Sequence, residues 1–311
     1  MYVIMYHYVR KIEHSRYPGI KGLELRMFKE QIRFLQENNF EFVSIKDLTD
    51  GKKVNDRSVL LTFDDGYIDH YTNVFPFLSD NGITGVFSMP AKIIREKKVL
   101  DVNKIHFILA SADIKVIKDK VFERMNYYRG TEYDIAPNEE LYNKLAVANR
   151  FDNKDTIFVK RLLQVELQEE LRNKITDELF TEIVSDNEAA FVDELYMSMD
   201  QVKMMNKCGM EFGIHGYDHY WMNRLTPDEL RMDIENAQLV FDGIINHDSW
   251  TCCYPYGSYS DDVIKVVKEL GATSGLATDV GVYNPSENDI FKIPRLDTND
   301  FPPKSDNYKN Y

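Results

Sequence analysis

Residues 58–66 read Ser-Val-Leu-Leu-Thr-Phe-Asp-Asp-Gly, and this stretch decides the class of fold. Its first six residues are mostly apolar and predict a short buried strand, and the carboxylates of Asp64 and Asp65 stand directly at the end of that strand. A stripe of helical spacing follows at residues 71–78, and residues 84–89 predict another strand. This order of strand, helix and strand is typical of βαβ units and predicts a parallel sheet.

The same rhythm extends outward along the chain. Further strands are expected at residues 2–6, 40–45, 211–214, 250–254, 273–276 and 291–294. Capping boxes at Ser198-Met-Asp-Gln201 and Thr226-Pro-Asp-Glu229 predict where two of the later helices begin, and the second of these helices is expected to run to about Ile245. We therefore predict an α/β fold, a distorted (β/α)7–8 barrel.

The rhythm breaks over residues 96–196, which are mostly helical in pattern and rich in charge. Within them, Leu167, Leu171, Ile175 and Leu179 recur every four residues, which predicts one long amphipathic helix. We expect residues 1–95 and 197–311 to form the barrel, with 96–196 as a mainly helical insertion.

The composition excludes several classes of function. The 311 residues carry 38 basic and 51 acidic side chains, a net charge of −13, which argues against a nucleic-acid partner. No apolar run approaches the roughly 20 residues of a membrane span. The first ten residues lack the features of a secretory signal, and three cysteines, two of them adjacent, make no disulfide framework. A cytoplasmic protein is therefore expected.

Polar residues follow many of the expected strands. They are His7, Asp64-Asp65, His215, Tyr256 and Arg295. Because the active sites of (β/α) barrels lie at the carboxyl ends of the strands, these side chains are expected to converge on one face. This convergence is the main reason to expect an enzyme.

The spacing His215-x-x-x-His219 is one that metal ligands adopt, because a helical turn would place both imidazoles on one face. The alternative is two histidines with separate hydrogen bonds. Asp64-Asp65-Gly66 could alternatively be a β-hairpin turn, although the pattern that follows it is helical and predicts no second strand of a hairpin. Two imidazoles and one carboxylate would leave open positions on a catalytic metal ion.

These residues resemble the polysaccharide deacetylase family, carbohydrate esterase family 4. The motifs that carry the resemblance are Thr62-Phe-Asp-Asp-Gly66, His215-x-x-x-His219 and Tyr254-Pro-Tyr-Gly257. The resemblance implies a distorted (β/α) barrel and a divalent metal held by Asp65, His215 and His219. Zn²⁺ is the expected ion, with Co²⁺, Ni²⁺ and Mn²⁺ as alternatives. It further implies that Asp64 is the general base and that the Tyr256 backbone N–H binds the oxyanion.

Two positions depart from the family pattern. Cys253 stands where the family usually has an arginine that orients the base, and Arg295 is the candidate to replace it, with a salt bridge at the rim as the alternative. The family's late histidine, its general acid, has no counterpart after His247. In the branch that resembles poly-N-acetylglucosamine deacetylases, a histidine after the first strand is thought to be the acid, which here is His7. Its alternative is a core histidine bonded to backbone.

The resemblance implies an N-deacetylase acting on a carbohydrate, and surface-polysaccharide biosynthesis is the expected context. A sugar linked to a lipid or a nucleotide is one form that the substrate could take. Tyr220 and Trp221, together with Tyr256, are candidates for binding the sugar. The alternatives are a related amidase on a small non-sugar amide, a non-haem Fe(II) oxygenase with the same ligand types, and a non-catalytic glycan-binding protein.

Overall fold

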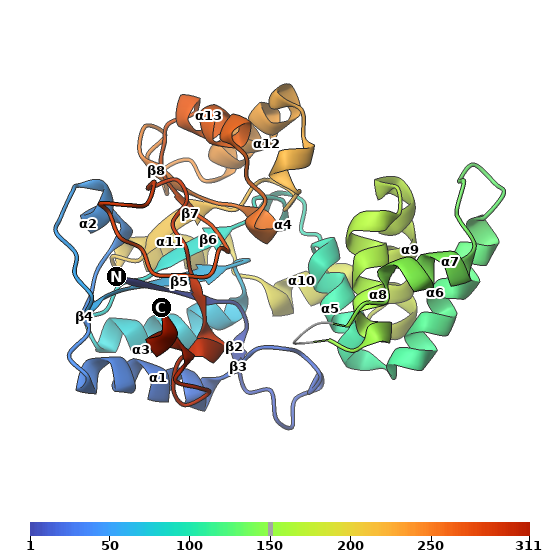
Figure 1. Cartoon of the computed structure of the whole chain (residues 1–311), viewed down its shortest axis with the longest axis horizontal. Coiled ribbons are helices and arrows are strands. Elements are labelled where there is room, and N and C mark those ends of the chain that lie inside the picture. Colours follow the sequence, from blue (N-terminus) through green and yellow to red (C-terminus); the bar gives the residue numbers. More distant parts are fainter. Residues whose placement is uncertain (149–151) are drawn as a thin grey trace. The chain divides into compact units, whose positions relative to one another are not determined.

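The computed structural model describes residues 1–148 and 152–311 of the chain, which forms two compact units. The barrel unit consists of residues 1–11, 22–97 and 193–311, and the helical unit consists of residues 12–21 and 98–192. Residues 12–21, which the sequence analysis assigned to the barrel, thus pack with the helical unit. Figure 1 labels the elements of both units.

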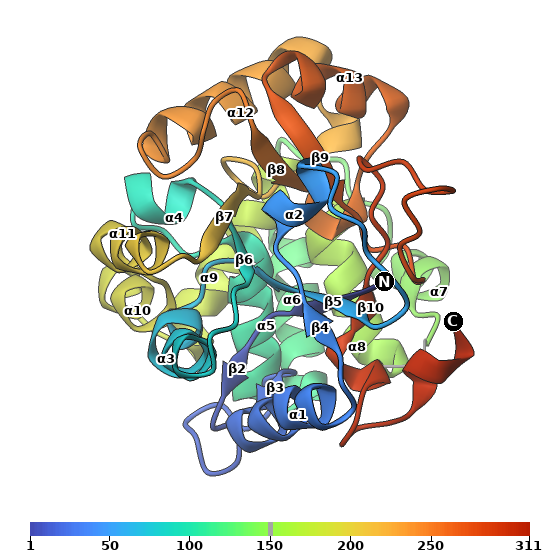
Figure 2. The same cartoon turned by 90° about the vertical axis from the view of Figure 1, so that its left-hand side faces the viewer.

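Parallel strands form the core of the barrel unit, which confirms the predicted fold class. They are β1 (Tyr2–Tyr6), β4 (Glu41–Phe42), β5 (Ser58–Asp64), β6 (Val86–Met89), β7 (Glu211–Ile214), β8 (Trp250–Cys253), β9 (Ala272–Leu276) and β10 (Leu296–Asp297). The order is β10-β1-β5-β6-β7-β8-β9, with β4 paired to the start of β5. Figure 2 labels all of these strands except β1. Ile293 bridges to Leu276 of β9 and Leu296 pairs with Ile4 of β1, so residues 293–297 join the two edges of this distorted barrel.

Helices alternate with these strands as the sequence predicts. They are α1 (Leu25–Glu37), α2 (Ile45–Thr49), α3 (Phe75–Asp80), α4 (Lys92–Arg95), α11 (Met199–Lys207), α12 (Pro227–Val240) and α13 (Asp261–Glu269). A π-helical turn, η1 (His70–Val74), precedes α3, and a small separate sheet pairs β2 (Val9–Arg10) with β3 (Leu23–Glu24). Both predicted capping boxes, at Ser198 and Thr226, are confirmed.

Three predicted elements have different bounds in the structure. The strand expected at residues 40–45 is shorter, because Ser44 and Asp47 form a capping box that starts α2 at Ile45. The strand expected at residues 291–294 is reduced to an isolated bridge, since Pro294 has no amide donor for a ladder. Helix α12 ends at Val240 rather than near Ile245.

The helical unit contains α5 (Asp101–Ser111), α6 (Ile114–Tyr128), α7 (Asn138–Leu145), α8 (Lys154–Arg161), the π-helical turn η2 (Leu162–Glu166) and α9 (Glu169–Ile183). Helix α10 (Glu188–Leu195) follows and runs across the boundary of the two units. The single long helix expected from Leu167 is wrong at its start: Leu167 is extended, and α9 begins two residues later. The rest of its stripe, Leu171, Ile175 and Leu179, is buried.

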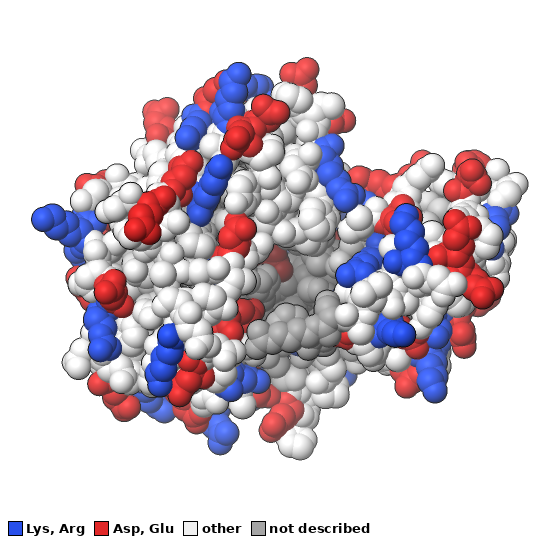
Figure 3. Space-filling model, in the orientation of Figure 1, with Lys and Arg blue, Asp and Glu red and all other residues white. Residues whose placement is uncertain are grey.

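The charged side chains on the side of the molecule drawn in Figure 3 are of both signs. Lysine and arginine side chains alternate with aspartate and glutamate over the side of the molecule drawn in Figure 3. Among the described residues, no helix is both long and apolar enough to cross a membrane.

Candidate active site

Strand β5 carries the two adjacent carboxylates to the end of the barrel interior. Alternate residues of a strand share a face, and Leu60 belongs to an apolar cluster with side chains of β1, β6, β8 and β9. Thr62 and Asp64 continue that inward face. Asp65 (φ 73°) and Gly66 (φ 69°) then take left-handed backbone conformations that turn the chain sharply. The two carboxylates therefore bind different partners although they are neighbours in sequence.

Asp65 faces His215 and His219, so the structure brings the three predicted metal ligands together. The Asp65 Oδ1 atom lies 3.5 Å from the Nε2 atom of His215 and 3.4 Å from that of His219. The two Nε2 atoms are 3.2 Å apart. A tetrahedral ion bonded at about 2.0–2.2 Å holds its ligand atoms about 3.3–3.6 Å apart. The spacing of these three atoms therefore fits a divalent metal.

The hydrogen bonds around the cluster leave the ligand atoms available. The Nδ1 atom of His215 lies 2.7 Å from the carbonyl oxygen of Cys253, and an N–H there leaves a lone pair on Nε2. The hydroxyl of Tyr67 donates to the other carboxylate oxygen of Asp65, Oδ2, at 2.5 Å. Oδ1 of Asp65 is buried and accepts no hydrogen bond in the described structure. A buried carboxylate oxygen facing two imidazole nitrogens is the donor set that Zn²⁺ prefers.

The electrostatics of the cluster follow from the same contacts. Burial alone would raise the pKa of Asp65, but the facing imidazoles of His215 and His219 outweigh burial and hold that pKa well below its ordinary value. For His219 burial dominates and lowers its pKa, which favours the neutral imidazole that a metal needs.

The two histidines lie on a bend rather than on the helical turn that the spacing suggested. Residues 215–219 form no helix, and His219 has a left-handed backbone (φ 58°). The carboxylate of Asp233 on α12 holds the bend by accepting hydrogen bonds from the backbone N–H groups of Tyr217 (2.9 Å) and Asp218 (3.4 Å). The side chain of Asp218 is engaged with Lys92 at 2.5 Å.

Asp64 forms a buried ion pair with Arg295. The Nη1 atom of Arg295 lies 2.9 Å from each carboxylate oxygen of Asp64, and both side chains are almost fully buried. The Nε–H of Arg295 donates to the carbonyl of Ala277, and its other donors face Thr62 Oγ1 and Cys253 Sγ. Burial would raise the pKa of Asp64, but the guanidinium outweighs burial and holds that pKa below its ordinary value.

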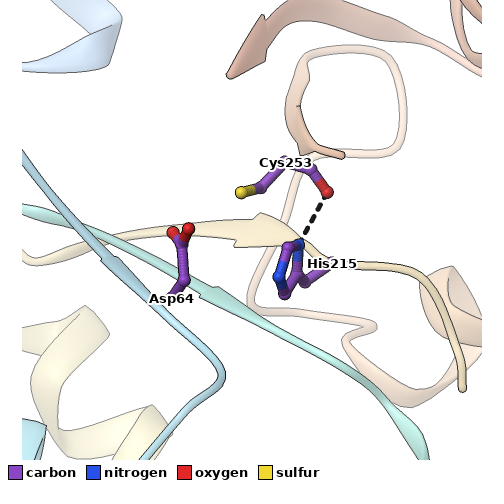
Figure 4. Close-up of side chains that lie close together, drawn as sticks. All are labelled: Asp64, His215 and Cys253. Atoms are coloured by element: carbon purple, nitrogen blue, oxygen red, sulfur yellow. Dashed lines mark hydrogen bonds between the residues drawn. The ribbon is translucent and has the colours of Figure 1, made fainter. Parts of the chain in front are cut away.

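Figure 4 shows a second group of possible ligand atoms, from Asp64, His215 and Cys253. Two of its three members already share a cation, because Arg295 contacts both the Asp64 carboxylate and the Cys253 sulfur. A metal ion there would be repelled by the guanidinium. The cluster of Asp65, His215 and His219 is thus the better metal site.

His7 lies beside Asp64. Tyr6 pairs with Phe63 in the ladder of β1 and β5, so His7 and Asp64 follow as neighbours at the strand ends. The His7 side chain is half-buried, and its charge contributes to the lowered pKa of Asp64. Its carbonyl lies 2.9 Å from the Nε2 atom of His70, a buried histidine whose pKa burial lowers to about 4.

The aromatic candidates are only partly brought together. The Tyr256 ring meets the edge of His219 at a centroid distance of 4.6 Å, and Trp221 stacks on Tyr256 at 4.5 Å. Tyr256 itself has a left-handed backbone (φ 59°). Tyr220 is half-buried. The stacked pair stands directly beside the metal cluster.

Sequence reasoning missed two residues that build this site, Tyr67 and Asp233. Tyr67 follows the Asp65-Gly66 turn immediately, so its position next to a ligand was the available signal. Asp233 lies in mid-helix and gave none, because its contact with the bend at residues 217–218 is formed only by folding.

Comparison with known proteins supports the resemblance to a known family. The family model described as Polysaccharide deacetylase matches residues 133–275, a range that includes His215, His219 and Tyr256. Residues 133–275 of the chain thus match the polysaccharide deacetylase family. Asp64 and Asp65 lie before the matched range, and the structure places them against the matched histidines.

The individual proteins to which the chain is similar are distant from it in sequence. YxkH of Bacillus subtilis (strain 168) is 18% identical over 283 residues, which are 90% of this chain and 64% of YxkH. The poly-beta-1,6-N-acetyl-D-glucosamine N-deacetylase of Escherichia coli (strain K12) is 40% identical over 68 residues, 21% of this chain and 10% of that protein. The chain therefore spans less than two thirds of the length of either relative.

Two solved structures share the fold of this chain. The Streptococcus pyogenes deacetylase PplD, determined with acetate, has a TM-score of 0.59 at 14% identity, covering 100% of this chain and 96% of PplD. IcaB from Ammonifex degensii has a TM-score of 0.56 at 16% identity, covering 100% and 97%. At such low sequence identities, the similarity to these two structures shows a shared fold only.

Proposed function

We propose that the protein is a metal-dependent N-deacetylase that hydrolyses the acetamide of an N-acetylated sugar in surface-polysaccharide biosynthesis. The observation that carries the proposal is the grouping of Asp65, His215 and His219, with ligand atoms 3.2–3.5 Å apart, beside the buried pair of Asp64 and Arg295. Metal-assisted amide hydrolysis needs a base to deprotonate water and a metal ion to polarise the carbonyl, and this arrangement would supply both.

Asp65, His215 and His219 would hold the metal, for which we propose Zn²⁺, with Co²⁺, Ni²⁺ or Mn²⁺ as alternatives. When bound, such an ion lowers the pKa of water and polarises a carbonyl oxygen. The ligand types, nitrogen and carboxylate oxygen, suit Zn²⁺.

The protein's own groups move the protons. Asp64 accepts a proton from the attacking water while the water oxygen bonds to the acetamide carbon. Arg295 keeps the Asp64 carboxylate ionised and oriented. The backbone N–H of Tyr256 donates to the developing oxyanion. His7 gives a proton to the amine nitrogen as the C–N bond breaks, so that acetate and a free amino sugar leave. The lowered pKa of Asp64 supports its ionised state before the reaction.

The substrate class rests on the relatives and on the aromatic pair. Several relatives carry the name poly-beta-1,6-N-acetyl-D-glucosamine N-deacetylase. Trp221 and Tyr256 supply aromatic surface beside the cluster, as sugar-binding sites commonly do, and Tyr220 is adjacent in sequence. We propose a sugar bearing an N-acetyl group, including one linked to a lipid or nucleotide carrier. The three cysteines among the described residues are all free, which supports a cytoplasmic location.

The test is acetate release. Protein loaded with Zn²⁺ is incubated with β-1,6-linked N-acetylglucosamine oligosaccharides, and acetate and free amine are both measured. We expect equal amounts of the two products, loss of activity with a chelator, and turnover lowered by about 10²–10⁴-fold in Asp64→Asn. Hydrolysis of small acetamides without any hydrolysis of the sugar would support the amidase instead, and Fe(II)-dependent oxygen uptake would support the oxygenase.

A further inference from the structure

Three tyrosine rings are stacked behind the metal-binding carboxylate. Tyr67 stacks with Tyr8, at a centroid distance of 4.0 Å, and with Tyr196, at 6.1 Å, and both neighbours are nearly parallel to it. Tyr67 is fully buried, and its backbone bridges to that of Tyr196. The stack therefore fixes the plane and the direction of the Tyr67 side chain.

The hydroxyl of Tyr67 is aimed at one oxygen of Asp65. It donates to Oδ2 at 2.5 Å, while Oδ1 faces the Nε2 atoms of His215 and His219 at 3.5 and 3.4 Å. The carboxylate thus has one oxygen bound to the protein and one oxygen turned to the two imidazoles. Oδ1 accepts no other hydrogen bond in the described structure.

We infer that Tyr67 is a positioning residue that makes Asp65 a single-oxygen metal ligand. The inference rests on the proposed metal site. The Tyr67 hydroxyl donates a hydrogen bond to Oδ2 of Asp65, and this bond holds Oδ2 away from the ion. Without the hydroxyl, Oδ2 would be buried without a partner, and the carboxylate would be free to rotate and bind through both oxygens.

Tyr8 extends this arrangement. Its hydroxyl is hydrogen-bonded to the Tyr67 side chain, so the chain of contacts runs from Tyr8 through Tyr67 to Asp65. Tyr8 also follows His7 directly in sequence. One short segment after β1 therefore supplies the proposed acid and, through the next residue, supports a metal ligand.

The experiment measures metal binding in the full-length chain. Wild type, Tyr67→Phe and Tyr6→Phe are titrated with Zn²⁺ against a chromophoric chelator, and the visible spectrum of each Co²⁺ form is recorded. Tyr6 is a matched control because it is also fully buried, and its hydroxyl donates at 2.6 Å to Gln31, a neutral residue of α1. Tryptophan fluorescence shows that each variant is folded.

We expect Tyr67→Phe to weaken Zn²⁺ binding by about 10–100-fold, as loss of a group that orients a ligand does. Its Co²⁺ spectrum should weaken as the coordination number rises. Tyr6→Phe should match wild type in both measurements. Tyr8→Phe should weaken Zn²⁺ binding less than Tyr67→Phe, and it carries the test if Tyr67→Phe does not fold.

Equal Zn²⁺ affinity and equal Co²⁺ spectra in wild type and Tyr67→Phe would overturn the inference. If Tyr67→Phe does not fold, Tyr8→Phe with the affinity of Tyr6→Phe would do the same. Failure of the proposed function looks different: wild type itself would then bind no Zn²⁺, or Asp65→Asn would bind it as tightly as wild type.

Discussion

Replacing Arg295 with methionine tests the ion pair on which the proposed base depends. The guanidinium lies 2.9 Å from both oxygens of Asp64, and the side chains of Arg295 and Asp64 are 0% and 2% exposed. Methionine keeps much of the volume but removes the charge. Asp64 would then be a buried carboxylate without a cation, and the carbonyl of Ala277 would lose its donor.

The expected loss of unfolding free energy is large. Removing one partner of a buried ion pair costs about 3–5 kcal/mol, and the hydrogen bond to Ala277 adds about 0.5–1.5 kcal/mol. The double variant Asp64→Asn/Arg295→Met buries no charge, so it should be less destabilised than the two single losses predict. We expect this coupling to reach the upper part of the range of about 0.5–3 kcal/mol.

The assay is urea unfolding in the presence of a chelator, followed by tryptophan fluorescence. Both tryptophans of the chain, Trp221 and Trp250, lie in the barrel unit, so the signal reports on that unit alone. The control is Arg231→Met, because Arg231 pairs with Glu269 on the surface, at 38% and 45% exposure, and should lose no more than about 1 kcal/mol. An Arg295→Met variant as stable as Arg231→Met would refute the argument.

Three further predictions concern other residues of the site. Asp64→Asn should lower turnover by about 10²–10⁴-fold while Zn²⁺ content stays that of wild type; loss of the metal would show that Asp64 is a ligand. His7→Ala should lower kcat by a similar factor of about 10²–10⁴ with little change in Zn²⁺ affinity, and near wild-type kcat in the folded, loaded variant would mean that the proton comes from elsewhere. Burial raises the pKa of Asp233 from 3.8 to about 6, so the stability it contributes is complete below pH 3.8 and is lost as the pH rises through about 6. Urea midpoints measured across that interval should fall less in Asp233→Asn than in wild type, and parallel curves would contradict the raised pKa.

Much of the site could be predicted because parallel strands end at one edge. Asp64, Asp65 and His215 each follow a strand, and the structure gathers them from β5 and β7. The periodicity that predicts a strand also predicts where its last residue points. The same holds for the helix starts at Ser198 and Thr226, whose capping signals lie within four residues of sequence.

Features built by contacts between distant residues had no such signal. The bend that carries His219 depends on Asp233, whose carboxylate binds backbone N–H groups 15 and 16 residues earlier. The packing of residues 12–21 with the helical unit depends on contacts such as that of Lys21 with Asp152, 131 residues apart. Neither leaves a periodic pattern in the local sequence, because each is decided by which surfaces meet after folding.

Arg295 combines a position that the sequence indicated with a contact that only folding creates. Because Arg295 follows an expected strand, the sequence suggested that its side chain meets Asp64 from the end of a strand, but the structure places its backbone elsewhere. Leu296 and Leu61 both pair with Ile4, so the backbone of Arg295 lies about level with Leu60, well inside the barrel. The long arginine side chain extends from there past Thr62 and reaches Asp64.

The strand order explains why His7 and Arg295, the two proposed substitutes for family residues, can both reach Asp64. In the sequence β10-β1-β5, the strand carrying Asp64 is followed across the sheet by the strand that ends at His7, and then by the strand that Arg295 precedes. Asp64, the proposed base at the end of β5, is therefore within reach of residues next to the first and last strands of the chain. An arginine from either β8, at Cys253, or the start of β10 can meet the same carboxylate, because Cys253 Sγ itself contacts the guanidinium of Arg295. The chemistry thus constrains the point at which the charges meet and leaves open which strand supplies them.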